Sequence, residues 1–187
     1  MASKPNATRD PIVAAVRESY GRVVYTHKTH EKAREIASRR ADLVKLGNIV
    51  LTVLTTASLL STVITNQRAL LYVSSALSAL TLLFVFFQLS FDPARESEQH
   101  RATAKELWYV REQYIHLLAD LKTSPDAPDL AKRRDEMTEE LKKIYALAPN
   151  TSSKAYAAAQ KALKVSEDMT FSDDEIDQFL PTPLHSS

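Results

Sequence analysis

Two long stretches without a charged side chain constrain this sequence most strongly. Leu46 to Gln67 and Ala69 to Phe91 contain no Lys, Arg, Asp or Glu, although 25% of the whole chain is charged. At about 1.5 Å per helical residue, each stretch makes a helix about 33 Å long, enough to cross the roughly 30 Å hydrocarbon core of a bilayer. The alternative is a buried hairpin of a soluble domain, but the remaining chain is too short and too charged to enclose it. We therefore expect two transmembrane helices.

The residues around these spans predict their orientation. Asn66, Gln67 and Arg68 form the only polar cluster between the spans, so they fit the water-exposed tip of a tight hairpin. Basic residues are concentrated on the other side of both spans, which predicts that both chain ends are cytoplasmic. Those basic residues are Lys32, Arg34, Arg39, Arg40 and Lys45 before the first span, and Arg95, Arg101 and Lys105 after the second.

The pattern predicts an all-α membrane protein: a transmembrane hairpin with a long N-terminal helix and a cytoplasmic helical bundle. Asp-Pro pairs at 10–11 and 92–93 are typical helix starts, and no proline interrupts the chain from 12 to 65. We expect further helices from about 129 to 147 and from about 154 to 165. The expected units are an amphipathic N-terminal helix (1–45), the hairpin (46–91, with spans 46–65 and 69–91), cytoplasmic helices (92–166) and an acidic disordered tail (167–187).

Catalytic or metal-binding patterns are not recognisable in this sequence. His27 and His30 share a helical face, but no third ligand has the spacing of a metal site. Acidic residues alternate with Lys and Arg, which is typical of a solvated helix surface and argues against strong nucleic-acid binding. We therefore predict no catalytic residue, no cofactor and no metal, and a protein that is not an enzyme.

Polar residues inside the two spans allow two interpretations. The spacing in the second span predicts one polar stripe, and the first span carries a broader set of threonines. Such residues either let the helices pack closely or, in an oligomer, line a water-filled path. Two helices per chain cannot enclose a pore, so the second interpretation requires several protomers. The candidates are Ser74, Ser78, Thr81 and Gln88 in the second span and Thr52, Thr55 and Thr62 in the first.

Two more groups of residues are candidates for contacts with partners. An apolar face after the second span predicts contacts between cytoplasmic helices of a homo-oligomer, although its aromatic residues fit a protomer core equally well. Its apolar positions are Leu107, Val110, Tyr114, Leu117, Leu118 and Leu121. The candidate contacts between protomers are Leu107, Trp108, Tyr114, Leu118 and Leu121. In the acidic tail, Ile176, Phe179 and Leu180 are isolated apolar residues that either dock on a basic partner groove or belong to an inert solubilising tail.

The overall arrangement resembles the SLATT domain of prokaryotic conflict systems. The resemblance extends from about residue 10 to residue 165 and rests on two segments that follow the hairpin. The first is "HRATAKELWYVREQYIHLLADL" (100–121), with Leu-Trp before Arg-Glu-x-Tyr. The second is "IYALAPNTSSKAYAAAQKAL" (144–163), with its Ala-Pro-x-Thr connection followed by Ala-Tyr.

The resemblance implies a membrane effector of bacterial antiphage defence. Such a protein is expected in the inner membrane and is usually encoded beside a sensor or an enzyme that synthesises nucleotides or nucleic acids. When triggered by that partner or by a nucleotide signal, it would oligomerise and permeabilise the membrane, causing growth arrest or cell death (abortive infection). The alternative is a membrane anchor or scaffold that conducts nothing and docks and regulates a cytoplasmic partner enzyme.

Overall fold

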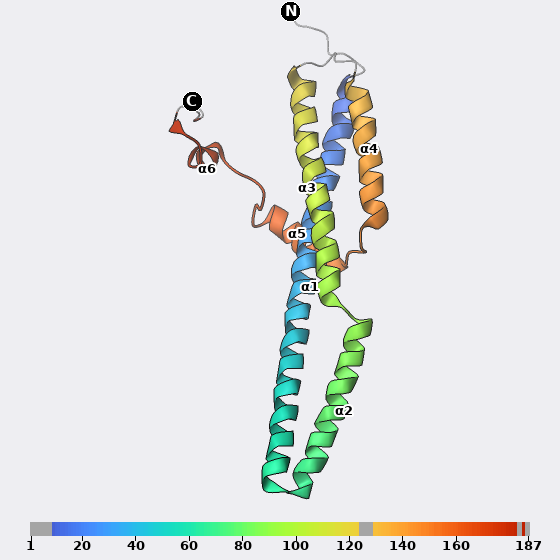
Figure 1. Ribbon diagram of the computed structural model, residues 1–187. Helices are drawn as coiled ribbons and strands as arrows, with labels where there is room; N and C mark the ends of the chain where they lie inside the picture. Colours follow the sequence, from blue (N-terminus) through green and yellow to red (C-terminus); the bar gives the residue numbers. More distant parts are fainter. Residues whose placement is uncertain (1–8, 124–128, 183–184, 186–187) are drawn as a thin grey trace, which may run out of the picture.

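The computed structural model describes residues 9–123, 129–182 and 185, and these residues contain helices but no strand. The all-α prediction is therefore confirmed. A two-helix hairpin extends from one end of a helical bundle, and the hairpin turn lies at the opposite end of the molecule from the start of the first helix (Figure 1). In chain order the helices are α1 (Arg9–Thr65), α2 (Arg68–Ser90), α3 (Pro93–Thr123), α4 (Leu130–Leu147), α5 (Ser153–Lys164) and α6 (Asp173–Asp177).

Helix α1 is continuous over 57 residues and belongs to both the bundle and the hairpin. Its backbone passes through Gly21 and Gly47 without a break, since neither glycine has a positive φ. It begins at Arg9, so Asp10 lies within the first turn and is not the cap that the sequence pattern predicts. A single rigid element therefore connects the polar bundle with the apolar hairpin.

The hairpin turn is as short as the sequence predicts. Asn66 adopts a φ of 52°, a left-handed conformation that Asn tolerates better than most residues, and its N–H donates to the carbonyl of Thr62 at 3.0 Å. Arg68 is the first residue of α2, so the one charge between the apolar stretches lies at the turn.

Helix α3 restarts the chain at Pro93 after the apolar stretch ends. Proline has no N–H to donate, so it is tolerated at a helix start but would break the interior of a helix. The Oδ1 atom of Asp92 accepts the N–H of Arg95 at 3.0 Å, which is the predicted cap. This break allows α3 to leave the direction of α2 and pack along α1 (Figure 1).

The hydrophobic core lies in the bundle, where α3 packs against α1 on one side and α4 on the other. The predicted apolar face of α3 is buried, because its residues recur every three or four positions and so project from one side. Arg133 in α4 pairs with Asp120 in α3 at 2.6 Å. The core residues are Val16, Val23, Leu107, Val110, Tyr114, Leu117, Leu121, Leu130 and Met137.

The hairpin, in contrast, exposes most of its apolar surface. Two helical segments, Pro11–Thr65 and Arg68–Thr123, contain stretches long and apolar enough to cross a membrane, and only 0% and 6% of those stretches are buried. The central helix of a soluble protein would be covered on all sides, whereas a span needs its apolar side chains to face lipid. This exposure fits the two-span interpretation.

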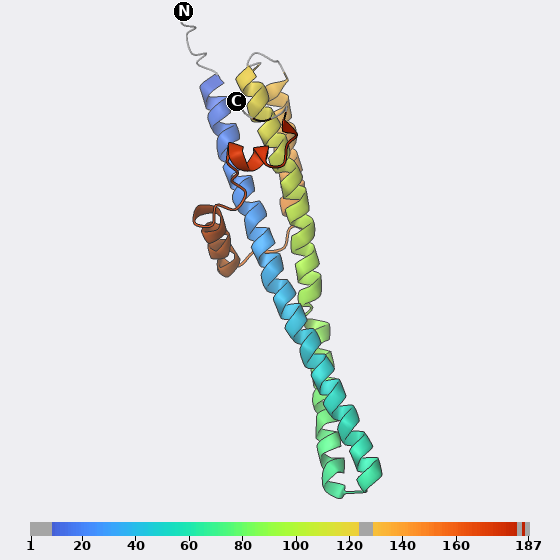
Figure 2. The same ribbon diagram turned by 90° about the vertical axis from the view of Figure 1, so that its left-hand side faces the viewer.

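Helix α5 lies alongside α1, and the tail continues from it (Figure 2). Ala155, Ala159 and Ala162 are buried on one face of α5, since small side chains let the two helices approach closely. The tail includes the short helix α6, which the sequence pattern does not predict. It begins with a capping box in which Ser172 and Glu175 exchange side-chain to backbone hydrogen bonds.

Candidate functional site

A seam of hydroxyl groups joins the two helices of the hairpin. Ser74 of α2 is fully buried, and its Oγ atom lies 2.7 Å from the Oγ of Ser58 and 3.2 Å from the Oγ1 of Thr62, both in α1. Two turns further along α2, the Oγ1 atoms of Thr81 and Thr55 are 3.2 Å apart. We call these five residues the hydroxyl seam. Ser74 is buried between the helices and the other four side chains are half-buried, in a hairpin whose exposed side chains are mostly apolar.

The hydroxyl seam is a weak attachment between the helices. Each hydroxyl has one proton, and the hydroxyls of Ser74, Thr81 and Thr55 also donate to a carbonyl in their own helix at 2.8 Å. Bonds across the helices therefore compete with bonds inside them. Hydrogen bonds between transmembrane helices average only about 0.6 kcal/mol. The seam can open without leaving its hydroxyls unpaired, because every one retains a carbonyl on its own helix.

The predicted stripe of the second span is split by the structure. Ser74 and Thr81 face α1, but Ser78 is exposed on the outside of the hairpin, and so is Thr52 of α1. Ser78 lies four positions after Ser74 and three before Thr81, so the helical turn places its side chain at the edge of the interface between α1 and α2, where it is exposed. Gln88 is partly buried near the end of α2, and its Nε2 atom has no hydrogen-bond partner among the described residues.

The predicted contacts between protomers are mostly core residues of a single chain. Leu107, Tyr114 and Leu121 are buried in the bundle, where they pack against α1, and Leu118 packs partly against the same core. The three buried residues therefore contribute to the core of the single chain, and Leu118 is half-buried. Only Trp108 is available for such a contact, with 50% of its surface exposed.

Three histidines are buried where α1 and α3 meet. The Nδ1 atoms of His30 and His100 are 2.9 Å apart, and His27 lies one turn before His30. Burial and the neighbouring histidines lower the pKa of His30 to about 4, and burial also lowers the pKa of His27 and of His100. Within the described residues, no group of three His, Cys, Asp or Glu residues could hold a metal ion.

A charged cavity of about 330 Å³ opens beside this histidine cluster, between α1 and α3. Arg101 pairs with Glu98 at 3.3 Å, but Arg34 and Lys105 have no ion pair among the described residues. The half-exposed indole of Trp108 lines the same cavity, and so does His27, whose buried Nδ1 atom lacks a described partner. The carboxylate of Glu31 also lines the cavity and pairs with Lys28. The cavity thus combines two cations that have no described ion pair with an aromatic face, a pattern that sequence spacing did not reveal because its residues come from two helices.

The tail is attached to α1 by a nearly buried ion pair. Lys28 is 8% exposed, and its Nζ atom lies 2.9 Å from a carboxylate oxygen of Asp168 and 2.9 Å from one of Glu31. Burial works against the Lys28 charge, but these two hydrogen bonds outweigh it and raise the pKa of Lys28. The hydrogen bond from Lys28 lowers the pKa of Asp168. Further along the tail, the predicted docking residues Ile176, Phe179 and Leu180 are exposed.

Comparison with known proteins gives one match. The family model described as SMODS and SLOG-associating 2TM effector domain family 4 matches residues 12–175. The match contains the hairpin, the hydroxyl seam, the histidine cluster and the charged cavity. No curated protein and no solved structure matches the chain.

Proposed function

The chain belongs to the SMODS and SLOG-associating 2TM effector domain family 4, and from that premise we propose that it permeabilises a membrane when a signal reaches its helical bundle. The hairpin would lie in a bacterial inner membrane with both chain ends in the cytoplasm. Several protomers would assemble, because one hairpin cannot enclose a pore. Growth arrest or death of the infected cell would follow from loss of the membrane barrier.

The observation that carries this proposal is the hydroxyl seam inside the apolar hairpin. In the closed arrangement, the Ser58, Thr62 and Ser74 hydroxyls face one another and the hairpin presents apolar side chains to lipid. Separation of α1 from α2 within an assembly would turn these hydroxyls toward a shared path that water can enter. The weak bonds across the seam favour such a change, because a modest difference in ligand affinity can shift a balanced equilibrium.

Helix α1 supplies the connection between signal and membrane. Its bundle half packs against α3, and its other half forms one side of the hydroxyl seam. A ligand that alters the packing of α1 on α3 would also move the first span. We propose the charged cavity as the receiving site and a nucleotide signal as its ligand, because Arg34 and Lys105 suit phosphates and the face of Trp108 suits a base. A genomically linked enzyme that synthesises nucleotides or nucleic acids would supply the signal.

A disulfide across the seam tests the opening step. The chain has no cysteine, so Ser58→Cys with Ser74→Cys introduces the only two thiols, at positions whose side-chain oxygens are 2.7 Å apart. We expect the oxidised protein in liposomes to retain an entrapped dye in the presence of the signal and to release it after reduction. The matched control is Thr52→Cys with Ser78→Cys, whose positions are exposed and not paired in the structure. Equal release before and after reduction of the seam pair would contradict seam opening.

Binding of the signal can be measured apart from release. Trp108 is the only tryptophan, so its fluorescence reports directly on the charged cavity. We expect quenching by an activating nucleotide, and at least about tenfold weaker binding in Arg34→Gln, since charge-assisted phosphate contacts are strong. Arg39→Gln removes the same charge from α1 outside the cavity lining and is expected to bind as the wild type does.

The exposed apolar residues of the tail favour a second candidate function, a membrane scaffold that docks a partner enzyme and conducts nothing. Phe179 is the most exposed of the three docking candidates. Its replacement in Phe179→Asp would remove an apolar anchor without touching the bundle core. Loss of co-purification of the genomic partner, together with no dye release from the wild type under any condition, would favour this scaffold function.

A further inference from the structure

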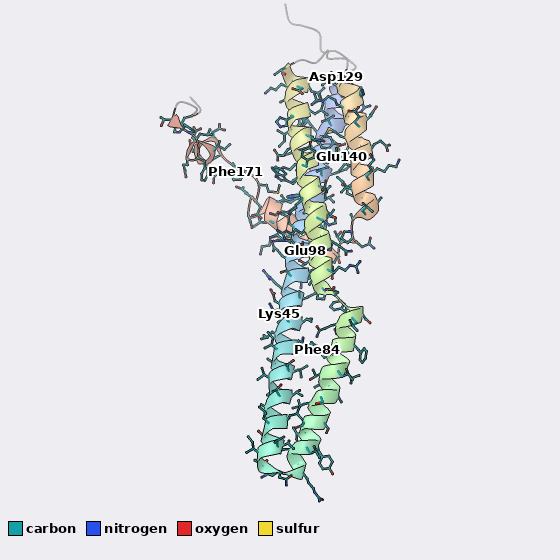
Figure 3. The ribbon with its side chains drawn as sticks, in the orientation of Figure 1. Lys45, Phe84, Glu98, Asp129, Glu140 and Phe171 are labelled. Atoms are coloured by element: carbon teal, nitrogen blue, oxygen red, sulfur yellow. The ribbon has the colours of Figure 1, made fainter. Side chains whose placement is uncertain are left out.

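A second cavity lies where the hairpin meets the bundle, at the level where the apolar stretches end. Its volume is about 430 Å³, and its lining comes from α1, the end of α2 and the start of α3. Lys45 and Asp92 are the first charged residues beyond the two apolar stretches, and both line this cavity. Figure 3 marks Lys45 on α1 and Phe84 on α2 near this junction. We call it the interfacial cavity, because in a bilayer it would lie among the lipid headgroups.

Backbone geometry explains why the cavity exists. Next to it, the ring of Phe84 reaches from α2 to the backbone of α1, since a Cβ atom added to Gly47 would lie 3.2 Å from the Cζ atom of Phe84. Beyond that contact α2 ends at Ser90, and Pro93 starts α3 in a new direction. The break leaves space between the three helix segments that their own side chains do not fill.

The polar groups of the interfacial cavity have few partners. Lys45 and Asp92 both line the cavity, but neither forms an ion pair with any described residue. One carboxylate oxygen of Asp92 caps α3, which leaves the other free. The buried Nε2 atom of Gln88 has no described hydrogen-bond partner, and the side-chain amide of Asn48 has none within the described part of the chain either. A buried donor left unpaired costs stability, so a ligand that accepts from Gln88 is favoured.

The chemistry of these groups selects a zwitterion. A phosphodiester can accept hydrogen bonds from Lys45, Asn48 and Gln88, while a primary ammonium on the same headgroup can donate to Asp92. The apolar side chains of Val85 and Leu89 line the cavity on the hairpin side, where acyl chains would run. Phosphatidylglycerol, an anionic lipid without an amine, would bring no cation for Asp92, and the quaternary ammonium of phosphatidylcholine has no N–H to donate.

We propose that the interfacial cavity binds the headgroup of an aminophospholipid of the phosphatidylethanolamine class. The site is independent of signal binding and of permeabilisation, because none of its residues belongs to the hydroxyl seam or to the charged cavity. Its effect would be to hold the junction of α2 and α3 at a fixed depth in the bilayer.

Native mass spectrometry of the full chain, purified in detergent and titrated with lipids of identical acyl chains, tests the proposal. We expect phosphatidylethanolamine to be retained about tenfold more tightly than phosphatidylglycerol or phosphatidylcholine, the size of one charge-assisted contact. Asp92→Asn should remove this preference, and because Asn caps helices as well as Asp does, α3 should keep its start. Lys45→Gln should weaken retention of all three lipids about tenfold.

The controls make each outcome decisive. Lys122→Gln removes the same charge at a position about 44 Å along α3 from Pro93, outside both cavities, and should leave lipid retention unchanged. Soluble glycerophosphoethanolamine in hundredfold excess should not displace the lipid, because it lacks acyl chains. Displacement would show that the cavity binds a free phosphodiester and not a lipid, which would overturn the proposal. Equal retention of the three lipids by the wild type, or an equal effect of Lys122→Gln and Lys45→Gln, would also overturn it. Helix content measured by circular dichroism identifies any variant that fails to fold.

Discussion

The Nδ1 atom of His30 in α1 lies 2.9 Å from the Nδ1 atom of His100 in α3, a contact between residues 70 positions apart. The two side chains are only 2% and 1% exposed. One nitrogen must donate and the other accept, so the contact cannot survive when both imidazoles are charged. The packing of α1 on α3 at this level therefore depends on at least one of the two histidines staying neutral.

Acidification should destabilise the bundle through this pair. An unfolded histidine has a pKa near 6.5, whereas burial and the neighbouring histidines lower the pKa of His30 to about 4. Between these pH values the unfolded chain binds more protons than the folded one, so stability is fully present above about pH 6.5 and decreases as the pH falls toward 4. We expect the melting temperature in detergent to decrease by about 5 °C or more from pH 7.5 to 4.5.

A histidine variant provides the control for this pH effect. Glu31 and Glu96 each lie 4.0 Å from a histidine of the cluster and favour its protonated form, while Arg111 and Lys28 oppose protonation of His27. His30→Gln keeps a polar side chain but cannot titrate, so its melting temperature should depend less on pH in this window. A wild-type slope retained in His30→Gln would assign the acid sensitivity to other groups.

Leu107 and Trp108 are neighbours in the sequence with opposite expected roles. Leu107→Ala removes a fully buried side chain and should lower the free energy of unfolding by about 2–5 kcal/mol. Trp108→Ala removes a half-exposed side chain and should change stability by less than about 1 kcal/mol. Thermal unfolding in detergent checks both values. A larger loss in Trp108→Ala than in Leu107→Ala would show that Trp108 is buried in the protein's working assembly.

Asp168 should control the attachment of the tail. Asp168→Asn removes the carboxylate that pairs with the nearly buried Lys28, although Glu31 still contacts that ammonium group. We expect the backbone amides near residue 168 to exchange hydrogen about tenfold faster, because the local opening energy is reduced. Asp174 forms no ion pair with any described residue, so Asp174→Asn serves as the charge-matched control. Exchange near residue 168 that is as slow in Asp168→Asn as in the wild type would contradict the role of this ion pair.

Gly47 should be required for the packing of the Phe84 ring against the first span. A Cβ at this position would lie 3.2 Å from that ring, so Gly47→Val should displace the ring and destabilise the hairpin by about 1–3 kcal/mol. Phe84→Leu should rescue part of that loss, as residues in direct contact do not act additively. Gly21→Val is the control, since a Cβ there meets no atom within 4 Å. Equal losses at the two glycines, without rescue, would exclude a specific clash with Phe84.

Local properties of the chain determined the helices. The two uncharged stretches predict spans because hydropathy and length act residue by residue, and the turn at Asn66 and the restart at Asp92 and Pro93 follow from local backbone preferences. The buried face of α3 was predicted for the same reason, since helical periodicity places Leu107, Val110 and Tyr114 on one side.

The partner of each face was decided by the tertiary structure alone. Periodicity predicts that the α3 face is buried but does not tell whether α1 or a second protomer covers it, so for Leu107, Tyr114 and Leu121 it cannot distinguish a core within one chain from contacts between chains. Spacing likewise grouped Ser78 with Ser74, because a stripe on an isolated helix is wider than the strip that one neighbouring helix covers.

The pairs that give the molecule its candidate sites join residues far apart in the sequence. His30 meets His100, Ser58 meets Ser74, and Lys28 meets Asp168 only after the helices have packed in one register. The sequence by itself determined where the chain becomes helical, where it breaks and which stretches enter lipid. Which side chains touch was decided by packing, because the position of one helix against another depends on the sum of many weak contacts along both.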